Sequence, residues 1–335
     1  MPELVIVVSD LYLPEEGRAD SVSLPGLERV ARFGKKSLLA ATWRPWLARH
    51  VGCEALALEA AACVAARSLD ADITGGVWIA SPVHCIAGLS SVHLEHRGLL
   101  KLPMATLAAL AADFQAVFQG AGFALHPLAS GGFLLAGPAS DDAHALEPAR
   151  SVGMNMAAAL PRSPALRRLG AEIEIWLHEH AVNRDRSERG ELPVTGLWLW
   201  GGGICAPAPR APIRQAAVAA VRAFGRDPYL EGLWRARGAR VEALPASLAD
   251  LDDTPAHSSV IVVDVADILA LERTASVGDA LGLLDARWIA PAADWLSRGA
   301  RRGLTVIGND RCLSLSRHDA LKRWRRARHG LSALA

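Results

Sequence analysis

Short apolar runs rich in β-branched residues alternate along this sequence with segments whose apolar side chains recur every three or four positions. Leu4–Val8 and Ser259–Val265 are of the first kind, which predicts strands, whereas Leu107–Phe118 and Leu166–Leu177 are of the second, which predicts helices. Strands separated by helices favour a parallel sheet, because parallel neighbours need a long crossover connection. We therefore expect an α/β fold: a mainly parallel sheet flanked by helices, with a second, smaller α+β lobe.

The same patterns predict the remaining elements. Helices are expected at 27–34, Ile213–Phe224 and Pro228–Arg237, and strands at Gly76–Ala80, Val92–Leu100, Phe123–Leu128, Gly132–Leu135, Pro193–Trp200, Arg240–Leu244 and Leu304–Ile307. Pro82 is expected to stop one strand, and the glycines at 201–203 to end another sharply. Between Gly137 and Val152 the composition shifts to Pro, Asp, Ser and Ala, which predicts a boundary between a lobe of residues 1–140, with a hairpin–helix–strand insert, and a lobe of residues 141–335.

Composition and charge exclude several classes of protein. A hydrophobic fraction of 51% in 335 residues supplies a sizeable core, and 36 Lys and Arg against 35 Asp and Glu argue against general nucleic-acid binding. The five cysteines are scattered without a CxxC pair, so we expect reduced thiols. The opening apolar run is too short and too acidic for a signal peptide, and no run reaches the roughly 20 residues of a membrane helix. We expect a cytoplasmic protein.

Two groups of residues have the chemistry of a binding site. Asp10 follows a predicted strand, where α/β sheets place ligand groups, and its oxygens suit a hard divalent cation; the alternative is a carboxylate that only caps a turn. Asn183 and Arg184 would face Gly201, Gly202 and Gly203, whose N–H groups could form an anion nest for a phosphate or carboxylate. The alternative is a tight turn with ordinary surface arginines.

The histidines are weaker candidates. His84 is either a ligand group or a loop histidine held by backbone hydrogen bonds. His178 and His180 are two positions apart on a predicted helix and point in different directions, so they do not chelate one ion. We expect His180 to hydrogen-bond to the loop that follows.

Sequence motifs narrow the possible classes of function further. The sequence has no GxSxG elbow, no P-loop and no GxGxxG after a strand, which disfavours the enzyme classes that carry them. The basic stretch Lys322–Arg328 near the C-terminus is expected to be helical and either touches an acidic partner or is a solvated face.

Two stretches carry a resemblance to a known family. The segment EIEIWLHEHAVNRDRSERGELPVTGLWLWGGG (Glu172–Gly203) and the segment WIASPVH (Trp78–His84) resemble the RpfE-type bacterial regulatory proteins. The chain departs from the family pattern at Ser81, where Asp is usual, and at Ala181, where Pro is usual. The resemblance implies a regulatory or binding role.

RpfE-type proteins are in turn similar to the archaeal-type cofactor-independent phosphoglycerate mutases of the alkaline-phosphatase superfamily. Here the strand ending at Asp10 and SLPGLERVARFG (Ser23–Gly34) carry the likeness. The resemblance implies an alkaline-phosphatase-like fold and a site for Mn²⁺, Mg²⁺ or Zn²⁺, with four candidate ligands: Asp10, Asp264, Asp310 and His318. The adjacent Asp–His pair that the superfamily carries near a late strand has no equivalent.

Two functions follow from these resemblances. The first is a regulatory or binding protein on a degenerate phosphoglycerate-mutase-like scaffold, which recognises a phosphorylated or other anionic small molecule or a protein partner. The alternative is a metal-dependent phosphomutase or phosphatase with an altered metal site.

Overall fold

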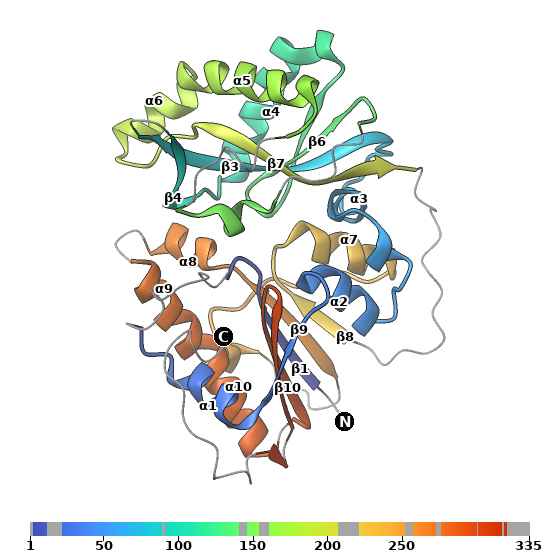
Figure 1. The fold of residues 1–335 in the computed structure, drawn as a ribbon, viewed down its shortest axis with the longest axis vertical. Helices are drawn as coiled ribbons and strands as arrows, with labels where there is room; N and C mark the ends of the chain where they lie inside the picture. Colours follow the sequence, from blue (N-terminus) through green and yellow to red (C-terminus); the bar gives the residue numbers. More distant parts are fainter. Residues whose placement is uncertain are drawn as a thin grey trace. The chain divides into compact units, whose positions relative to one another are not determined.

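The chain forms two compact units, each assembled from separate stretches of sequence (Figure 1). The computed structural model describes residues 3–11, 22–88, 91–140, 146–153, 161–206, 221–251, 257–272, 276–299, 301–316 and 318–319. Unit 1 comprises Met1–Ala57, Ile213–Arg226 and Ala239–Ala335; unit 2 comprises Leu58–Pro212 and Asp227–Gly238.

This division differs from the single boundary expected near residue 140. Residues on both sides of that position belong to unit 2, because strand β7 (Gly196–Cys205) pairs along most of strand β3 (Gly75–Ala87). A long-range pairing of this kind leaves no mark on local composition.

Unit 1 is built on a six-stranded, mainly parallel sheet, as the sequence predicts. The strand order is β2-β11-β10-β1-β9-β8, with β1 (Glu3–Val8), β2 (Lys35–Leu38), β8 (Val221–Phe224), β9 (Ser258–Val263), β10 (Gly303–Gly308) and β11 (Arg311–Ser316). Strand β1 is parallel to both its neighbours, and the hairpin to β11 adds the antiparallel edge. Residues Leu4–Val8 are buried on both faces, which explains their unbroken apolar run.

Helices cover the unit 1 sheet and complete its core. They are α1 (Pro25–Phe33), α2 (Trp43–His50), α8 (Val265–Leu271), α9 (Val277–Leu284), the π-helical turn η6 (Asp285–Ile289) and α10 (Ala290–Ser297), with a short 3-10 turn η5 (Leu248–Asp250). Apolar side chains of α1, α9 and α10 pack with alternate residues of β1, β9 and β10 in one cluster. This packing fixes where the loops after the parallel strands lie.

Unit 2 holds an antiparallel sheet of five strands. They are β3, β4 (Val92–Leu99), β5 (Ala124–Pro127), β6 (Phe133–Gly137) and β7. Its helices are α3 (Ala61–Ala66), α4 (Met104–Phe118), α5 (Pro164–His178), α6 (Ala181–Glu188) and α7 (Pro228–Ala236), with short 3-10 turns η2 (Gln119–Ala121) and η3 (Pro148–Ser151). A further 3-10 turn, η1 (Leu56–Leu58), begins in unit 1 and ends at the first residue of unit 2.

The two faces of the unit 2 sheet have different cores. Trp78 and Ala80 point toward α4 and α5, whereas Val77 and Ile79 point toward α3, as the two-residue period of a strand requires. Figure 1 shows α4 and α5 on one side of this sheet and α3 on the other. Both faces are therefore buried.

Several predicted elements change in the structure. Pro82 does not stop β3: it lies between the part of β3 that pairs with β6 and the part that pairs with β4. Residues Val221–Phe224 form β8 rather than the end of a helix, and 213–220 lie outside the described residues. Arg240–Leu244 contributes only an isolated bridge, between Glu242 and Phe224.

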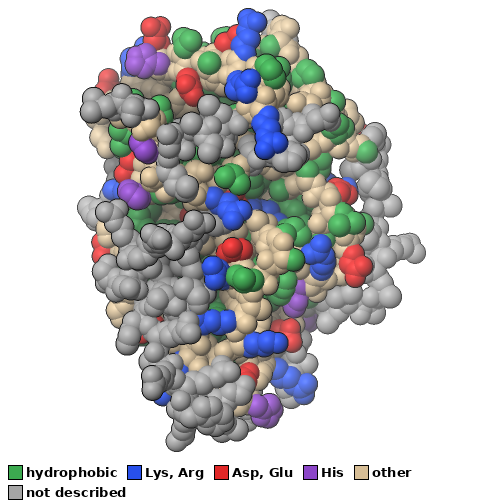
Figure 2. All heavy atoms as spheres, viewed as in Figure 1, with side chains coloured by type: hydrophobic (Ala, Val, Ile, Leu, Met, Phe, Trp, Pro, Cys, Tyr) green, Lys and Arg blue, Asp and Glu red, His purple; other side chains and the backbone are tan. Residues whose placement is uncertain are grey.

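The other predicted helices and strands are present, with ends that differ by a few residues. Within the described ranges, no helix has the length and hydropathy needed to cross a bilayer. The basic stretch Lys322–Arg328 lies outside the described residues. Figure 2 shows basic and acidic side chains interspersed over the described part of one face, in keeping with the near-zero net charge.

Candidate functional site

The strongest candidate site lies at the carboxyl edge of the unit 1 sheet. Ser9 and Asp10 follow β1, Asp264 follows β9, and Asn309 and Asp310 follow β10. Val8 is in register with Val263 on one side and Gly308 on the other, so these loops leave the sheet side by side. The edge thus gathers three carboxylates where α/β sheets bind ligands.

Asp10 caps helix α8. Its Oδ1 accepts a hydrogen bond from the Val265 N–H at 2.8 Å, and its Oδ2 accepts one from the Ala266 N–H at 2.9 Å. The first N–H groups of a helix have no partner within the helix, and the helix dipole favours a negative charge there. Asp264, which directly precedes α8, makes no side-chain cap bond, so the cap comes from Asp10, far away in sequence. The alternative that Asp10 serves a structural cap therefore has direct support.

Asn309 is a site residue that the sequence reasoning missed. It is fully buried and left-handed (φ 51°) in the tight turn between β10 and β11. Its Nδ2 donates to the Ser9 carbonyl at 3.1 Å, but its Oδ1 has no hydrogen-bond donor among the described residues. The sequence signal for this tight turn is the pair Asn309 and Asp310 between two strand-like runs, because Asn tolerates a left-handed backbone. A buried acceptor without a donor is costly, which marks this position as one that a ligand can satisfy.

The predicted metal ligands do not form one cluster. Asp264 is buried at 9% exposure, and the Asp310 carboxylate lies 3.7 Å from Arg311 Nε. His318 follows β11, whose last residue, Ser316, pairs with Gly303 at the start of β10. His318 therefore lies at the opposite edge of the sheet, roughly 20 Å from the carboxylates at about 3.3 Å per strand residue. Nowhere in the described parts of the chain do three His, Cys, Asp or Glu side chains stand where they could hold one metal ion. A two-metal centre does not fit this arrangement.

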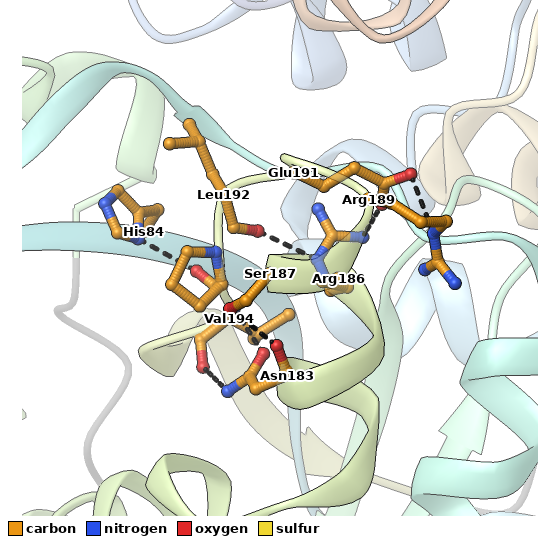
Figure 3. A network of polar contacts seen from close by, with 9 residues as sticks. His84, Asn183, Arg186, Ser187, Arg189, Glu191, Leu192 and Val194 are labelled. Carbon is orange, nitrogen blue, oxygen red and sulfur yellow. Dashed lines mark hydrogen bonds and ion pairs between the residues drawn. The ribbon is translucent and has the colours of Figure 1, made fainter.

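The second predicted site, around Asn183, is a structural clamp (Figure 3). Asn183 is buried, and its Nδ2 donates to the carbonyls of Leu177 and Val194 at 2.7 and 2.8 Å. Its Oδ1 accepts from the Val194 N–H at 2.8 Å. The amide therefore joins the end of α5 to the start of β7 and has little capacity left for a ligand.

The arginines and His84 serve the same loop. Arg186 is buried: its Nε donates to the Leu192 carbonyl at 2.8 Å, and its Nη1 pairs with Glu191 at 3.1 Å. Arg184 is exposed and donates to the Glu179 carbonyl at 3.0 Å. His84 Nδ1 lies 2.9 Å from the Pro193 carbonyl, as expected for a histidine held by the backbone (Figure 3).

The glycines at 201–203 do not end their strand and do not meet Arg184. They lie inside β7, where Gly201 (φ 62°) accompanies a register shift against Val77 and Ile79 of β3. Gly201 is seven positions beyond Val194, which places the glycines roughly 20 Å along the strand from the Asn183 clamp. The predicted anion nest is therefore not assembled.

His180 links two helices of unit 2. Its Nδ1 accepts from the Val182 N–H at 3.1 Å, which caps α6, and its Nε2 lies 3.2 Å from an oxygen of Asp113. Its ring meets Trp176 edge to face at 4.9 Å. The hydrogen bond that we expected His180 to make to a following loop is made instead to helix α6, which begins directly after it.

No protein-family model matches the sequence, and no curated protein matches it either. The structure is similar to a cofactor-independent phosphoglycerate mutase from Thermoplasma acidophilum, at 14% identity and a TM-score of 0.40, over 94% of this chain and 90% of that one. It is also similar to the PH0037 protein from Pyrococcus horikoshii, at 11% identity and a TM-score of 0.47, over 94% and 87% of the two chains. Both likenesses concern the fold and assign no residue a role. The RpfE-type resemblance stays a prediction.

Proposed function

We propose that this chain is a binding or regulatory protein without phosphoryl-transfer activity, and that its ligand site is the carboxyl edge of the unit 1 sheet. The observation that carries the proposal is the position of the Asp10 carboxylate, both of whose oxygens accept N–H groups of α8. A catalytic metal at Asp10 would have to share both oxygens with these two charge-assisted hydrogen bonds. Because Asp10 already supports helix α8, ligand binding explains the polar residues at this edge of the sheet better than metal catalysis does.

The chemistry of the edge suggests the class of ligand. Asp264, Asp310 and the orphan Oδ1 of Asn309 are all acceptors, which favour a ligand with several hydroxyl or amino donors. A bare phosphate would be repelled by the carboxylates. Mg²⁺ and Mn²⁺, however, need only one or two protein carboxylates when the ligand's phosphates supply other oxygens. We therefore propose a phosphorylated, hydroxyl-rich small molecule that binds as its divalent-cation complex.

A second candidate is a metal-dependent phosphomutase or phosphatase. Its support is the gathering of Asp10, Asp264 and Asp310 at one edge. It requires that Asp10 coordinate the metal through lone pairs that the Val265 and Ala266 N–H groups leave free. The two candidates therefore differ in what Asp10 does.

Calorimetric titration with a panel of sugar phosphates, each with Mg²⁺ and with a chelator, tests the proposal. We expect binding with Mg²⁺ that is lost with the chelator, weakened at least tenfold in Asp264→Asn and weakened in Asn309→Gly, which keeps the left-handed backbone but removes the orphan oxygen. Asp294→Asn is the matched control, because this exposed carboxylate lies on α10.

Turnover separates the two functions. We expect no phosphate release from any ester in the panel, with or without Mn²⁺. Release that disappears in Asp10→Asn, together with stoichiometric metal in the purified protein, would establish the enzyme instead. Failure of every sugar phosphate to bind would remove the proposed ligand class.

A further inference from the structure

The glycines of β7 allow a helix of small residues to lie against the strand. A Cβ on Gly203 would lie 2.4 Å from the Ala60 Cβ and 3.4 Å from the Cys63 sulfur, and one on Gly201 would lie 3.1 Å from the Ala61 Cβ. Real Cβ atoms do not approach other carbons to 2.4 Å, so Gly203 is required for this packing. The triplet that resembled an anion nest is a docking surface for α3.

This packing brings two cysteines together. Cys63 lies on α3 and Cys205 is the last residue of β7, on the same face of the strand as Gly203. Both thiols lie in the core cluster between α3 and the sheet, at 9% and 8% exposure, and each is the largest influence on the pKa of the other.

A charged pair borders the thiols. Arg67, one helical turn after Cys63, holds the Glu59 carboxylate through two hydrogen bonds of 2.9 and 3.0 Å. Its Nε is buried and has no hydrogen-bond partner among the described residues. Hydrogen bonding to Cys205 is the largest influence on the pKa of Cys63 and, together with a smaller effect of Arg67, lowers it against the opposing effects of burial and Glu59. The same hydrogen bond and burial raise the pKa of Cys205.

We propose that Cys63 and Cys205 are a redox-active dithiol pair, which hydrogen peroxide converts reversibly to a disulfide. The Cys63 thiolate attacks one peroxide oxygen, the O–O bond breaks, and the departing hydroxide takes a proton to leave as water. Cys63 is thereby oxidised to a sulfenic acid. The Cys205 sulfur then attacks the Cys63 sulfur, the S–O bond breaks, and the hydroxide leaves as water with the Cys205 proton. In sum, two thiols and one peroxide give one disulfide and two waters.

The bond would tie together the two ends of the main segment of unit 2. Cys63 lies in the first helix after the chain enters unit 2 at Leu58, and Cys205 ends β7, the last described strand before the chain leaves at Pro212. A disulfide here closes a loop of roughly 140 residues, which strongly restricts the unfolded chain. Oxidation would therefore stabilise unit 2 against local opening.

Mass spectrometry of the intact, full-length protein tests this proposal. After graded hydrogen peroxide we expect an intact mass lower by about 2 Da before alkylation and, after alkylation under denaturing conditions, three alkyl groups on the five cysteines. We also expect a single cross-linked peptide pair containing Cys63 and Cys205, and reversal by a dithiol reductant. Cys53, Cys85 and Cys312 serve as internal controls, because burial raises the pKa of Cys85 to about 11 and the other two, at 2% and 4% exposure, are less exposed than the pair. They should remain alkylatable.

Variants test the order of the two steps. In Cys205→Ser a sulfenic acid should accumulate at Cys63 and react with dimedone, whereas in Cys63→Ser no sulfenic acid should form at Cys205. If a variant does not fold, the wild-type peptide map still decides. The proposal is overturned if both thiols stay alkylatable after peroxide, if the cross-link joins other cysteines, or if Cys63 is oxidised to sulfinic acid without a cross-link.

Discussion

Asn183 pairs with the backbone of Val194 through both ends of its side-chain amide, each hydrogen bond being 2.8 Å long. The side chain therefore satisfies both the N–H and the carbonyl of Val194, as a neighbouring strand would, just before β7 begins. This explains how an Asn that we predicted to bind a ligand instead serves the fold: its side chain positions a loop.

Asn183→Asp is expected to destabilise the protein. A carboxylate cannot donate to the carbonyls of Leu177 and Val194, so two buried acceptors would face a negative charge, at a cost of about 2–4 kcal/mol. Chemical denaturation measures this free energy of unfolding. Arg184→Ala, on the exposed side of the same helix, should change it by less than about 0.5 kcal/mol. Equal effects of the two variants would contradict the clamp.

Gly232→Ala should destabilise unit 2 strongly. A Cβ on Gly232 would lie 1.8 Å from the Val64 carbonyl oxygen, so α3 and α7 would have to separate. We expect a loss of about 3 kcal/mol or more, measured by denaturant unfolding. Gly170→Ala on α5 is the control, because nothing lies within 4 Å of its added Cβ; it should raise the free energy of unfolding by about 0.5–1 kcal/mol. A neutral Gly232→Ala would mean that the two helices are not in close contact.

Glu231 should make stability depend on pH near neutrality. Burial, with a smaller contribution from Asp227, raises the pKa of its carboxyl from 4.5 to about 7. A raised pKa in the folded state means that the folded protein binds the proton more tightly, so this contribution is complete below about pH 4.5 and is lost as the pH rises through 7. Glu231→Gln should therefore be more stable than wild type at pH 8.5, by about 1–3 kcal/mol, and similar to it at pH 4.5.

Unfolding curves for the wild type and Glu231→Gln at pH 4.5, 6, 7 and 8.5 measure this difference. Exposed Glu188 on α6 supplies the control substitution, Glu188→Gln. A difference in the free energy of unfolding between Glu231→Gln and wild type that stays constant with pH would contradict the prediction.

Asp285 caps the start of α1, and its replacement should destabilise the protein. Its carboxylate, 2% exposed, accepts from the N–H groups of Gly26 and Leu27 at 2.8 and 2.7 Å. Asp285→Asn replaces one acceptor with a donor that meets an N–H group, and we expect a loss of about 1–3 kcal/mol in the free energy of unfolding. Asp294→Asn, which alters an exposed ion pair with Arg29, should cost less than about 1 kcal/mol. A loss for Asp294→Asn as large as that for Asp285→Asn would argue against the cap.

Local pattern determined much of the fold. The β-branched run Leu4–Val8 became the central strand β1, and the 3.6-residue periods at Leu107–Phe118 and Leu166–Leu177 became α4 and α5. These elements were predictable because side-chain direction repeats every two residues in a strand and every 3.6 in a helix. A buried face therefore produces a periodic pattern of apolar residues in the sequence. The loop position of Asp10 after β1 was predictable for the same reason.

Tertiary structure decided what these residues do. Asp10 caps α8, about 250 residues away in sequence, and the glycines at 201–203 admit α3 instead of ending a strand. The antiparallel turn at Asn309 carries His318 to the far edge of the sheet, away from Asp10 and Asp264. None of these relationships has a local signal, because each depends on strand register and on which distant backbone approaches within hydrogen-bond or van der Waals distance. The sequence by itself thus determined the elements and the apolar faces, whereas long-range pairing alone determined which polar groups are satisfied and which thiols meet.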